Sequence, residues 1–290
     1  MSSATMMVTS AALVLSVLVF IMNSYLILLH FCLGKIERKP EMSLIYTRFF
    51  VDSLLSLATT ANMINILVAT TTQYGLVIGN VNYIKFAIAW PNFSLGSLRA
   101  GLVLCITIDR CFATYFPIRY HIYRSKISIW MVYGVLLGYL TMEVLILFIG
   151  CRYDFVVPPF CVGYGCVVNE CYRTHWLVSE QFLYLSTVIM AVLLSIRLIF
   201  WKFAAKSVTS VGLSRANRIA LLDVFVIFFF DLLPAAVYHF FPQVTLKSVG
   251  PVASAAKIAA FALEATVIYM ILVKKPPTAK KNNITPAVSK

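Results

Sequence analysis

The 290-residue chain is 61% hydrophobic and 12% charged, and its mean hydropathy is +0.88. These values exclude an ordinary soluble domain and indicate a chain that lies largely within a lipid bilayer. The net charge of +13 does not indicate a nucleic-acid partner. Most of the basic residues fall in short segments on one predicted side of the membrane, where an anionic leaflet attracts them.

Seven apolar runs follow one another along the chain, each long enough to cross roughly 30 Å of hydrocarbon as a helix. Backbone groups in lipid must be hydrogen-bonded internally, and runs without strict alternation do not predict barrel strands. We therefore expect an all-α membrane protein, a seven-transmembrane helix bundle in which residues 1–290 form one domain. The predicted helices fall at about 10–33, 43–70, 86–112, 128–150, 178–201, 218–241 and 250–273, and a short basic tail, 274–290, follows.

Basic residues predict the orientation of this bundle, because short cytoplasmic loops retain Lys and Arg. With the N-terminus outside and the C-terminus inside, most of the 24 Lys and Arg residues, Arg48 among them, fall in inner segments. No Lys or Arg precedes the first run, so we expect it to remain as a helix and not to be cleaved as a signal peptide.

Four cysteines lie in the longest connection, roughly 151–177, which this orientation places outside the cell: Cys151, Cys161, Cys166 and Cys171. An oxidising compartment favours one or two disulfides there, and four thiols allow three complete pairings. A zinc site is the alternative. The loop offers only His175 besides the thiols and has no CxxC pair, which disfavours zinc.

The third run ends in the stretch IDRCFATYFPIRY, in which Asp109 and Arg110 are followed by Pro117, Ile118 and Tyr120. This stretch resembles the DRY motif and the following loop of rhodopsin-like G-protein-coupled receptors, with Cys111 in place of the usual tyrosine. The alternative is that the acid and the base only cap a helix at the membrane interface.

Together with RKPEMSLIYTRFFVDSLLSL in the second predicted helix, this stretch resembles the nematode serpentine chemoreceptors, most closely the class BC group. The resemblance implies a G-protein-coupled chemosensory receptor in the plasma membrane of sensory neurons or their cilia. A small molecule or pheromone would bind in an outer pocket, and a heterotrimeric G protein would bind inside. The resemblance implies no enzyme activity and no cofactor, and four scattered histidines without an HExxH pattern agree with this.

The same resemblance assigns roles to individual residues. Arg110 would pair with Asp109 in the resting state and face the G protein after activation. In the seventh helix only Tyr269 remains of the NPxxY motif. Asn23 and Asp52 correspond to the conserved Asn and Asp of the first two helices, where the aspartate often coordinates sodium.

Three ionisable residues share one predicted depth in the bilayer. By helix rise, Asp52, Arg99 and Glu264 each lie about 14–17 Å from the inner boundary, where an unpaired charge is costly. We expect a buried network in which the Arg99 guanidinium occupies the sodium site, so that the receptor is insensitive to sodium. An ion pair with only a structural role is the alternative.

The outer pocket should be lined by the upper halves of the third, fifth, sixth and seventh helices. Asn92 stands where amine receptors have an aspartate, which disfavours aminergic ligands. The other candidates are Glu180, Tyr184, Tyr238, His239, Lys257 and Phe261, and each could equally face headgroups or pack inside the bundle. Lys257 lies two residues short of the opsin lysine position, which is Ala259 here. This offset disfavours retinal and leaves snorkelling, or pairing with Glu143 or Glu180, as the alternatives.

Gly134 and Gly138 form a GxxxG pair that would allow dimerisation, although we expect internal packing. Two other function classes compete with a receptor. A ligand-gated ion channel of the inverted seven-helix odorant-receptor type is opposed by the basic-residue bias and by the DRY-like end of the third helix. A small-solute transporter is suggested only by the buried charges.

Overall fold

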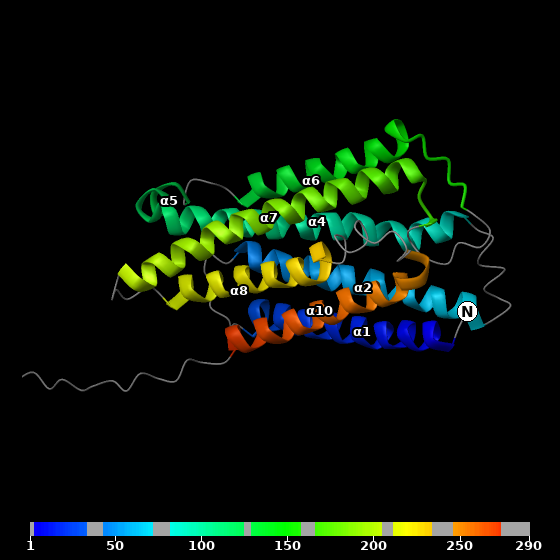
Figure 1. The fold of residues 1–290 in the computed structure, drawn as a ribbon, viewed down its shortest axis with the longest axis horizontal. Helices are drawn as coiled ribbons and strands as arrows, with labels where there is room; N and C mark the ends of the chain where they lie inside the picture. Colours follow the sequence, from blue (N-terminus) through cyan, green and yellow to red (C-terminus); the bar gives the residue numbers. More distant parts are fainter. Residues whose placement is uncertain are drawn as a thin grey trace, which may run out of the picture.

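The computed structural model describes residues 3–33, 43–71, 82–124, 129–157, 166–204, 211–233 and 246–273. Over these residues the chain forms seven long helices that lie side by side, with the short helix α5 at one end of the bundle (Figure 1). The long helices are α1 (Ser3–Phe31), α2 (Ser43–Thr71), α4 (Asn82–Tyr115), α6 (Ile129–Leu145), α7 (Glu170–Ala204), α8 (Val211–Ile227) and α10 (Leu246–Val273). The short helix α5 is Pro117–Arg124, and the π-helical turns η2 (Ile146–Gly150) and η4 (Phe228–Leu232) continue α6 and α8.

Among the described residues, five helices contain segments long and apolar enough to cross a membrane. These segments are Met6–Phe31, Ser43–Val68, Trp130–Gly150, Glu170–Phe200 and Ala255–Leu272. The two other long helices are α4, which carries several charges along its length, and α8. The all-α seven-helix membrane bundle predicted from the sequence is therefore the architecture that the structure has.

The start of α7 differs most from the predicted boundaries, because the helix begins at Glu170 and not near 178. Its first residues, ECYRTHWL, are too polar to stand out in hydropathy. Asn169 caps them: its Oδ1 accepts a hydrogen bond from the backbone N–H of Tyr172 at 3.1 Å. The connection before α7 therefore ends at Asn169. In the same way, α8 begins at Val211, ahead of the predicted 218, through the polar stretch GLSRANR.

The helix α4 occupies the centre of the bundle, where it packs against α2, α6, α7 and α8. A core at one end of the bundle joins α1, α2, α4, α7 and α8 through buried side chains that include Leu26, Phe49, Ile106, Leu194 and Ile219. Side chains of several helices can therefore meet around α4, and the polar groups described below do so.

Gly134 and Gly138 do not take part in internal packing, and that prediction is wrong. Both glycines are exposed on α6, and a Cβ atom built at either position would meet no described atom within 4 Å. The reason is that α6 lies at the edge of the bundle (Figure 1), where one of its faces has no neighbouring helix among the described residues.

The segment between α6 and α7 is fixed to both helices by a disulfide. Cys151 and Cys171 are bonded, with Cα atoms 5.7 Å apart, which confirms the predicted disulfide. Cys166 is also disulfide-bonded, and Cys161 lies outside the described residues. Asn169 strengthens the connection, because its Nδ2 donates a hydrogen bond to the Cys151 carbonyl at 2.7 Å.

Tyr153 anchors the same segment from within. Its hydroxyl donates to the Val167 carbonyl at 2.7 Å, and its ring packs among Phe86, Phe148 and Phe155. Burial, together with the neighbouring Asp154 carboxylate, raises the pKa of Tyr153, which keeps the phenol protonated and able to donate.

Candidate functional site

An ionic network lies inside the bundle where α2, α4 and α10 meet. The Arg99 Nε lies 2.9 Å from Oδ1 of Asp52, and its Nη2 lies 2.6 Å from Oε2 of Glu264. The Arg99 and Glu264 side chains are almost fully buried, and that of Asp52 is 11% exposed. The structure thus brings together the three residues that share a predicted depth.

Two further residues belong to this network and were missed in the sequence analysis. Arg48, grouped there with the inner-segment basic residues, is fully buried and directs its Nε to Asp52 Oδ2 at 3.2 Å. Its other two nitrogens pair with Glu264 and with Asp223 of α8. The spacing of Arg48 and Asp52, four residues apart on one helix face, was the signal that could have identified the first of them.

The charges in this network do not balance. Two guanidinium groups, those of Arg48 and Arg99, face the three carboxyl groups of Asp52, Asp223 and Glu264. Each carboxyl has a basic partner, which offsets the desolvation cost of burying it. The guanidinium carbon of Arg99 also lies 4.1 Å from the centre of the Phe261 ring, an arrangement typical of a cation–π contact.

A second polar cluster, which we call the lysine cluster, consists of Lys257, Glu180, Tyr184 and Asp231. The Lys257 Nζ lies 2.8 Å from Oδ1 of Asp231 and 3.5 Å from Oε1 of Glu180, and it donates to the Tyr184 hydroxyl at 3.1 Å. The Tyr184 hydroxyl donates in turn to Glu180 at 2.7 Å. The Lys257 side chain keeps 31% of its surface exposed, so the cluster remains open to an incoming group.

Asp231 was not among the predicted site residues. It lies in the π-helical turn η4, and its side chain is 3% exposed. A π turn adds a residue to one helical turn and so changes the direction of the side chains that follow, and such turns are frequent at functional sites. The pattern of α8 alone, a single acid in the run FVIFFFDLL, does not show which way Asp231 points.

The helix α10 joins the ionic network to the lysine cluster. Lys257, Phe261 and Glu264 follow one another at spacings of four and three residues, which places them on one face of the helix. Lys257 belongs to the lysine cluster, Glu264 belongs to the ionic network, and Phe261 lies between them under Arg99. The two polar centres are therefore separated by two turns of one helix.

At the far end of α4, Arg110 is held by two neighbours. Its Nη2 pairs with the Asp109 carboxylate and donates to the Tyr120 hydroxyl at 3.3 Å. Tyr120 reaches it from α5 and its hydroxyl also lies 3.1 Å from Oδ2 of Asp109. Although Arg110 lies near the end of its helix, the residue is only 1% exposed.

On the short helix α5, the other predicted residues of this region are exposed on the surface of the bundle. Pro117 is its first residue, a position at which proline is favoured because its missing N–H needs no partner. Pro117 is exposed, and Ile118 is 78% exposed, a large apolar side chain with no cover in the described structure.

The remaining predicted residues lie apart from these groups. Asn92 faces α2, where its Oδ1 accepts from Thr59 at 2.9 Å. Asn23 donates to the Val19 carbonyl of its own helix at 3.1 Å, and the Tyr269 ring lies 6.1 Å from that of Tyr25. Tyr238 and His239 lie outside the described residues.

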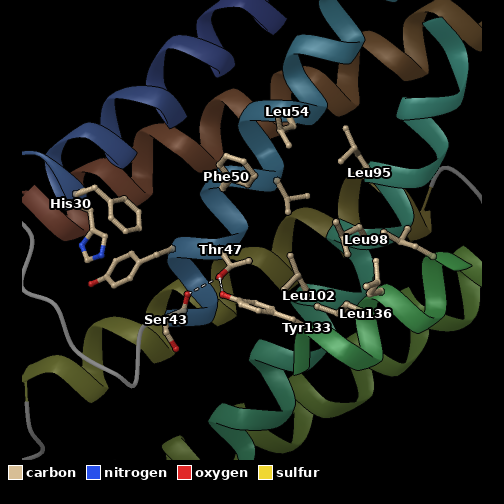
Figure 2. Close-up of a pocket in the computed structure, with 15 residues that line it drawn as sticks. His30, Ser43, Thr47, Phe50, Leu54, Leu95, Leu98, Leu102, Tyr133 and Leu136 are labelled. Carbon is tan, nitrogen blue, oxygen red and sulfur yellow. Dashed lines mark hydrogen bonds between the residues drawn. The ribbon is translucent and has the colours of Figure 1, made fainter. Parts of the chain in front are cut away.

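A groove of about 690 Å³ lies between α1, α2, α4 and α6, as Figure 2 shows. Its walls are apolar, with Phe50, Leu54 and Leu98 among them, and one polar contact, between the hydroxyls of Thr47 and Tyr133 at 2.5 Å, crosses it. Phe50 is 56% exposed, so the groove opens on the side of the bundle, toward lipid. It is separate from the predicted outer pocket, to which α7, α8 and α10 would contribute.

Comparison with known proteins identifies one family. The model of the family described as "Serpentine type 7TM GPCR chemoreceptor Srbc" matches residues 1–276, which is almost the whole chain. Comparison with curated proteins gives no match.

Proposed function

Because the chain belongs to the Srbc family of serpentine seven-transmembrane chemoreceptors, we propose that it binds a small chemical in an outer pocket and activates a heterotrimeric G protein. The observation that carries this proposal is the group formed by Asp109, Arg110 and Tyr120 at the end of α4. Arg110 is buried near the end of its helix and pairs with Asp109 and Tyr120, so a switch that exchanges these contacts for contacts with a G protein does not require the bundle to unfold.

The two ends of the bundle support an orientation with the N-terminus outside. The Cys151–Cys171 disulfide lies at the end where α4 begins, and disulfides persist in oxidising compartments. The Arg110 group lies at the opposite end of α4. Most Lys and Arg residues fall in the connections that the sequence assigns to this side, and such residues favour the cytoplasm. Arg110 then faces the compartment that holds G proteins.

The lysine cluster is the proposed ligand site. With the N-terminus outside, it lies in the outer part of the bundle. The ammonium group of Lys257 has two carboxyl groups and a phenol within 3.5 Å. A ligand that hydrogen-bonds to any of these groups competes with their present contacts. Binding energy can therefore shift the relative positions of α7, η4 and α10, which a conformational switch requires.

The proposed switch connects this site to Arg110. Ligand binding favours a state in which Arg110 leaves Asp109 and Tyr120 and, with Pro117 and Ile118, contacts the G protein. The family also supports a location in the plasma membrane of sensory neurons or their cilia, which is part of the proposal.

Two experiments test the proposal. The first is antibody access to tags on each terminus, in intact and in permeabilised cells: an outer N-terminus and an inner C-terminus are expected. Reversed access would place Arg110 on the wrong side for a G protein and would favour the inverted channel.

The second experiment compares Arg110→Ala with Arg119→Ala, an exposed arginine on α5. We expect Arg110→Ala to abolish nucleotide exchange on a co-expressed G protein at unchanged surface expression, and Arg119→Ala to retain it. Equal exchange in the two variants would remove Arg110 from the mechanism.

A further inference from the structure

A buried carboxyl group faces a half-buried imidazole between α6 and α7. The Glu143 side chain is 2% exposed, and its Oε1 lies 3.5 Å from Nε2 of His175, whose side chain is 32% exposed. The other oxygen, Oε2, accepts a hydrogen bond from the Tyr172 hydroxyl at 2.8 Å. One carboxyl oxygen is therefore hydrogen-bonded within the bundle, and the other points at a residue that solvent can reach.

The two atoms that face each other both lack a hydrogen-bond partner among the described residues. A buried carboxylate oxygen without a donor is costly, because it has lost its water and gained nothing in return. A neutral imidazole has one N–H, and when that proton lies on Nδ1 the Nε2 atom is an acceptor that cannot satisfy the carboxylate. Protonation gives both ring nitrogens an N–H, so a charged His175 always presents a donor to Glu143 and forms a strong charge-assisted hydrogen bond.

We propose that Glu143 and His175 form a proton-binding site, so that protons from the outer medium act as a second ligand of this receptor. The detail that protons come from outside depends on the orientation given under the proposed function, whereas the site itself does not.

The described side chains around the pair are polar. On α7 they include Tyr172, whose ring lies 6.2 Å from that of His175, and on α6 they include Tyr139, which lies one turn before Glu143 and interacts with its carboxyl group. The Tyr139 hydroxyl shares a hydrogen bond of 2.9 Å with Ser179.

From α4, Ser97 accepts a hydrogen bond of 3.0 Å from the indole of Trp176, next to His175. The charged pair on the same turn of α7, Arg173 and Glu170, is exposed, and Arg173 is engaged with Glu170 at 3.2 Å.

A proton bound here acts on the helix that carries part of the proposed ligand site. His175 lies on α7 one to three turns before Glu180 and Tyr184 of the lysine cluster. The Cys151–Cys171 disulfide already ties α6 to the first turn of α7. The Glu143–His175 contact would add a second, reversible tie between the same two helices. External acidity would therefore change how firmly α7 is held while a ligand binds.

The test measures the thermal midpoint, Tm, of the purified full-length receptor in detergent, where both faces of the bundle meet the buffer. Between about pH 8 and about pH 5.5, we expect the Tm of the native protein to rise by about 3 °C relative to His175→Gln. The sign follows from the pairing: the charge-assisted contact is present at low pH and is lost as the pH rises and the proton leaves. Gln offers a permanent amide donor at this position and cannot titrate in this range.

Glu143→Gln and Glu170→Gln form the matched pair of controls, because Glu170 is an exposed carboxylate on the next helix. Glu143→Gln should flatten the pH response as His175→Gln does, and Glu170→Gln should keep the native response. If the native protein, His175→Gln and Glu143→Gln all share one pH slope, the proton site does not exist.

A second readout separates this inference from the proposed function. External acidification of intact cells should change basal G-protein signalling of the native receptor and not that of His175→Gln. If the detergent result is as expected and His175 responds only to acidification of the cell interior, the proton site stands and the orientation is overturned.

Discussion

The Nε of Arg99 on α4 lies 2.9 Å from Oδ1 of Asp52 on α2. By the resemblance given in the sequence analysis, Asp52 corresponds to a receptor aspartate that often coordinates a sodium ion. Here the guanidinium brings a fixed positive charge to that carboxyl, and its second bond to Glu264 holds it there. We therefore propose that Arg99 takes the place of this ion.

Sodium should therefore have no specific effect on this receptor. Exchanging sodium for choline at constant ionic strength should leave the Tm of the native protein and its basal signalling unchanged. Arg99→Ser removes the cation and should create sodium dependence at the freed Asp52 carboxylate. A native protein that responds to sodium, with the same response in Arg99→Ser, would contradict the assignment.

The imbalance of charge in the ionic network predicts which of its residues tolerate substitution. Arg48→Met leaves three buried carboxyl groups with one guanidinium and should cost about 3–5 kcal/mol, enough to prevent folding or surface expression. Asp223→Asn balances two acids against two bases and should cost about 1–2 kcal/mol. Surface expression and Tm of the two variants give the comparison, and an Arg48→Met protein that is as stable as Asp223→Asn would show that charge balance does not govern this site.

The contacts of Arg110 predict constitutive activity when they are weakened. Asp109→Asn removes the charge that pairs with Arg110 and should raise basal nucleotide exchange several-fold. Tyr120→Phe removes the weaker 3.3 Å contact from α5 and should raise it less. The measurement is nucleotide exchange in membranes at matched receptor density, and a decrease in Asp109→Asn would reverse the proposed role of this pair.

The disulfide should matter for folding and not for signalling as such. Removing the Cys151–Cys171 bond by Cys151→Ser should cost about 2–4 kcal/mol and lower surface expression. Cys32→Ser is the matched control, since Cys32 is a free, exposed cysteine and its loss should change nothing. Normal expression of Cys151→Ser would show that folding does not depend on the Cys151–Cys171 bond.

Lys257 should control ligand response. Lys257→Gln removes the ammonium from the lysine cluster and leaves Glu180 and Asp231 without their basic partner. In a screen of small organic chemicals, any compound that activates the native receptor through this cluster should need at least about a tenfold higher concentration in Lys257→Gln, a loss of 1.4 kcal/mol. Thr59→Ala, which affects the α2 contact of Asn92, serves as a control outside the cluster. Equal potency in all three proteins would move the ligand site elsewhere.

The sequence predicts how deep a residue lies in the bundle better than it predicts which way its side chain points. Helix rise converts residue positions to depths, which is why Asp52, Arg99 and Glu264 could be placed at one level before any contact was known. It fails for Arg48, because the long side chain of a residue near a helix end can extend either to the interface or into the bundle. The structure shows the second outcome for this residue.

The direction of a side chain around its helix axis can be predicted only where hydropathy varies along the helix. From residue 219 to residue 233 every residue except Asp223 and Asp231 is apolar, so the inward facing of these two acids has no signal in the sequence. For Asp231 the π turn also changes the direction that an ideal helix would give. The pairing of Lys257 is a similar case: of the two acids considered for it, the structure selects Glu180, and Glu143 instead faces His175.

The position of Phe261 between Lys257 and Glu264 on α10 implies thermodynamic reciprocity between the two polar centres. If a ligand at Lys257 binds one arrangement of α10 more tightly, a change at Glu264 or Arg99 that increases the population of this arrangement raises the apparent ligand affinity in proportion. Residues that never touch the ligand would then set the sensitivity of the receptor. Natural variation in the ionic network could adjust the concentration at which an animal detects a chemical and leave unchanged which chemical it detects.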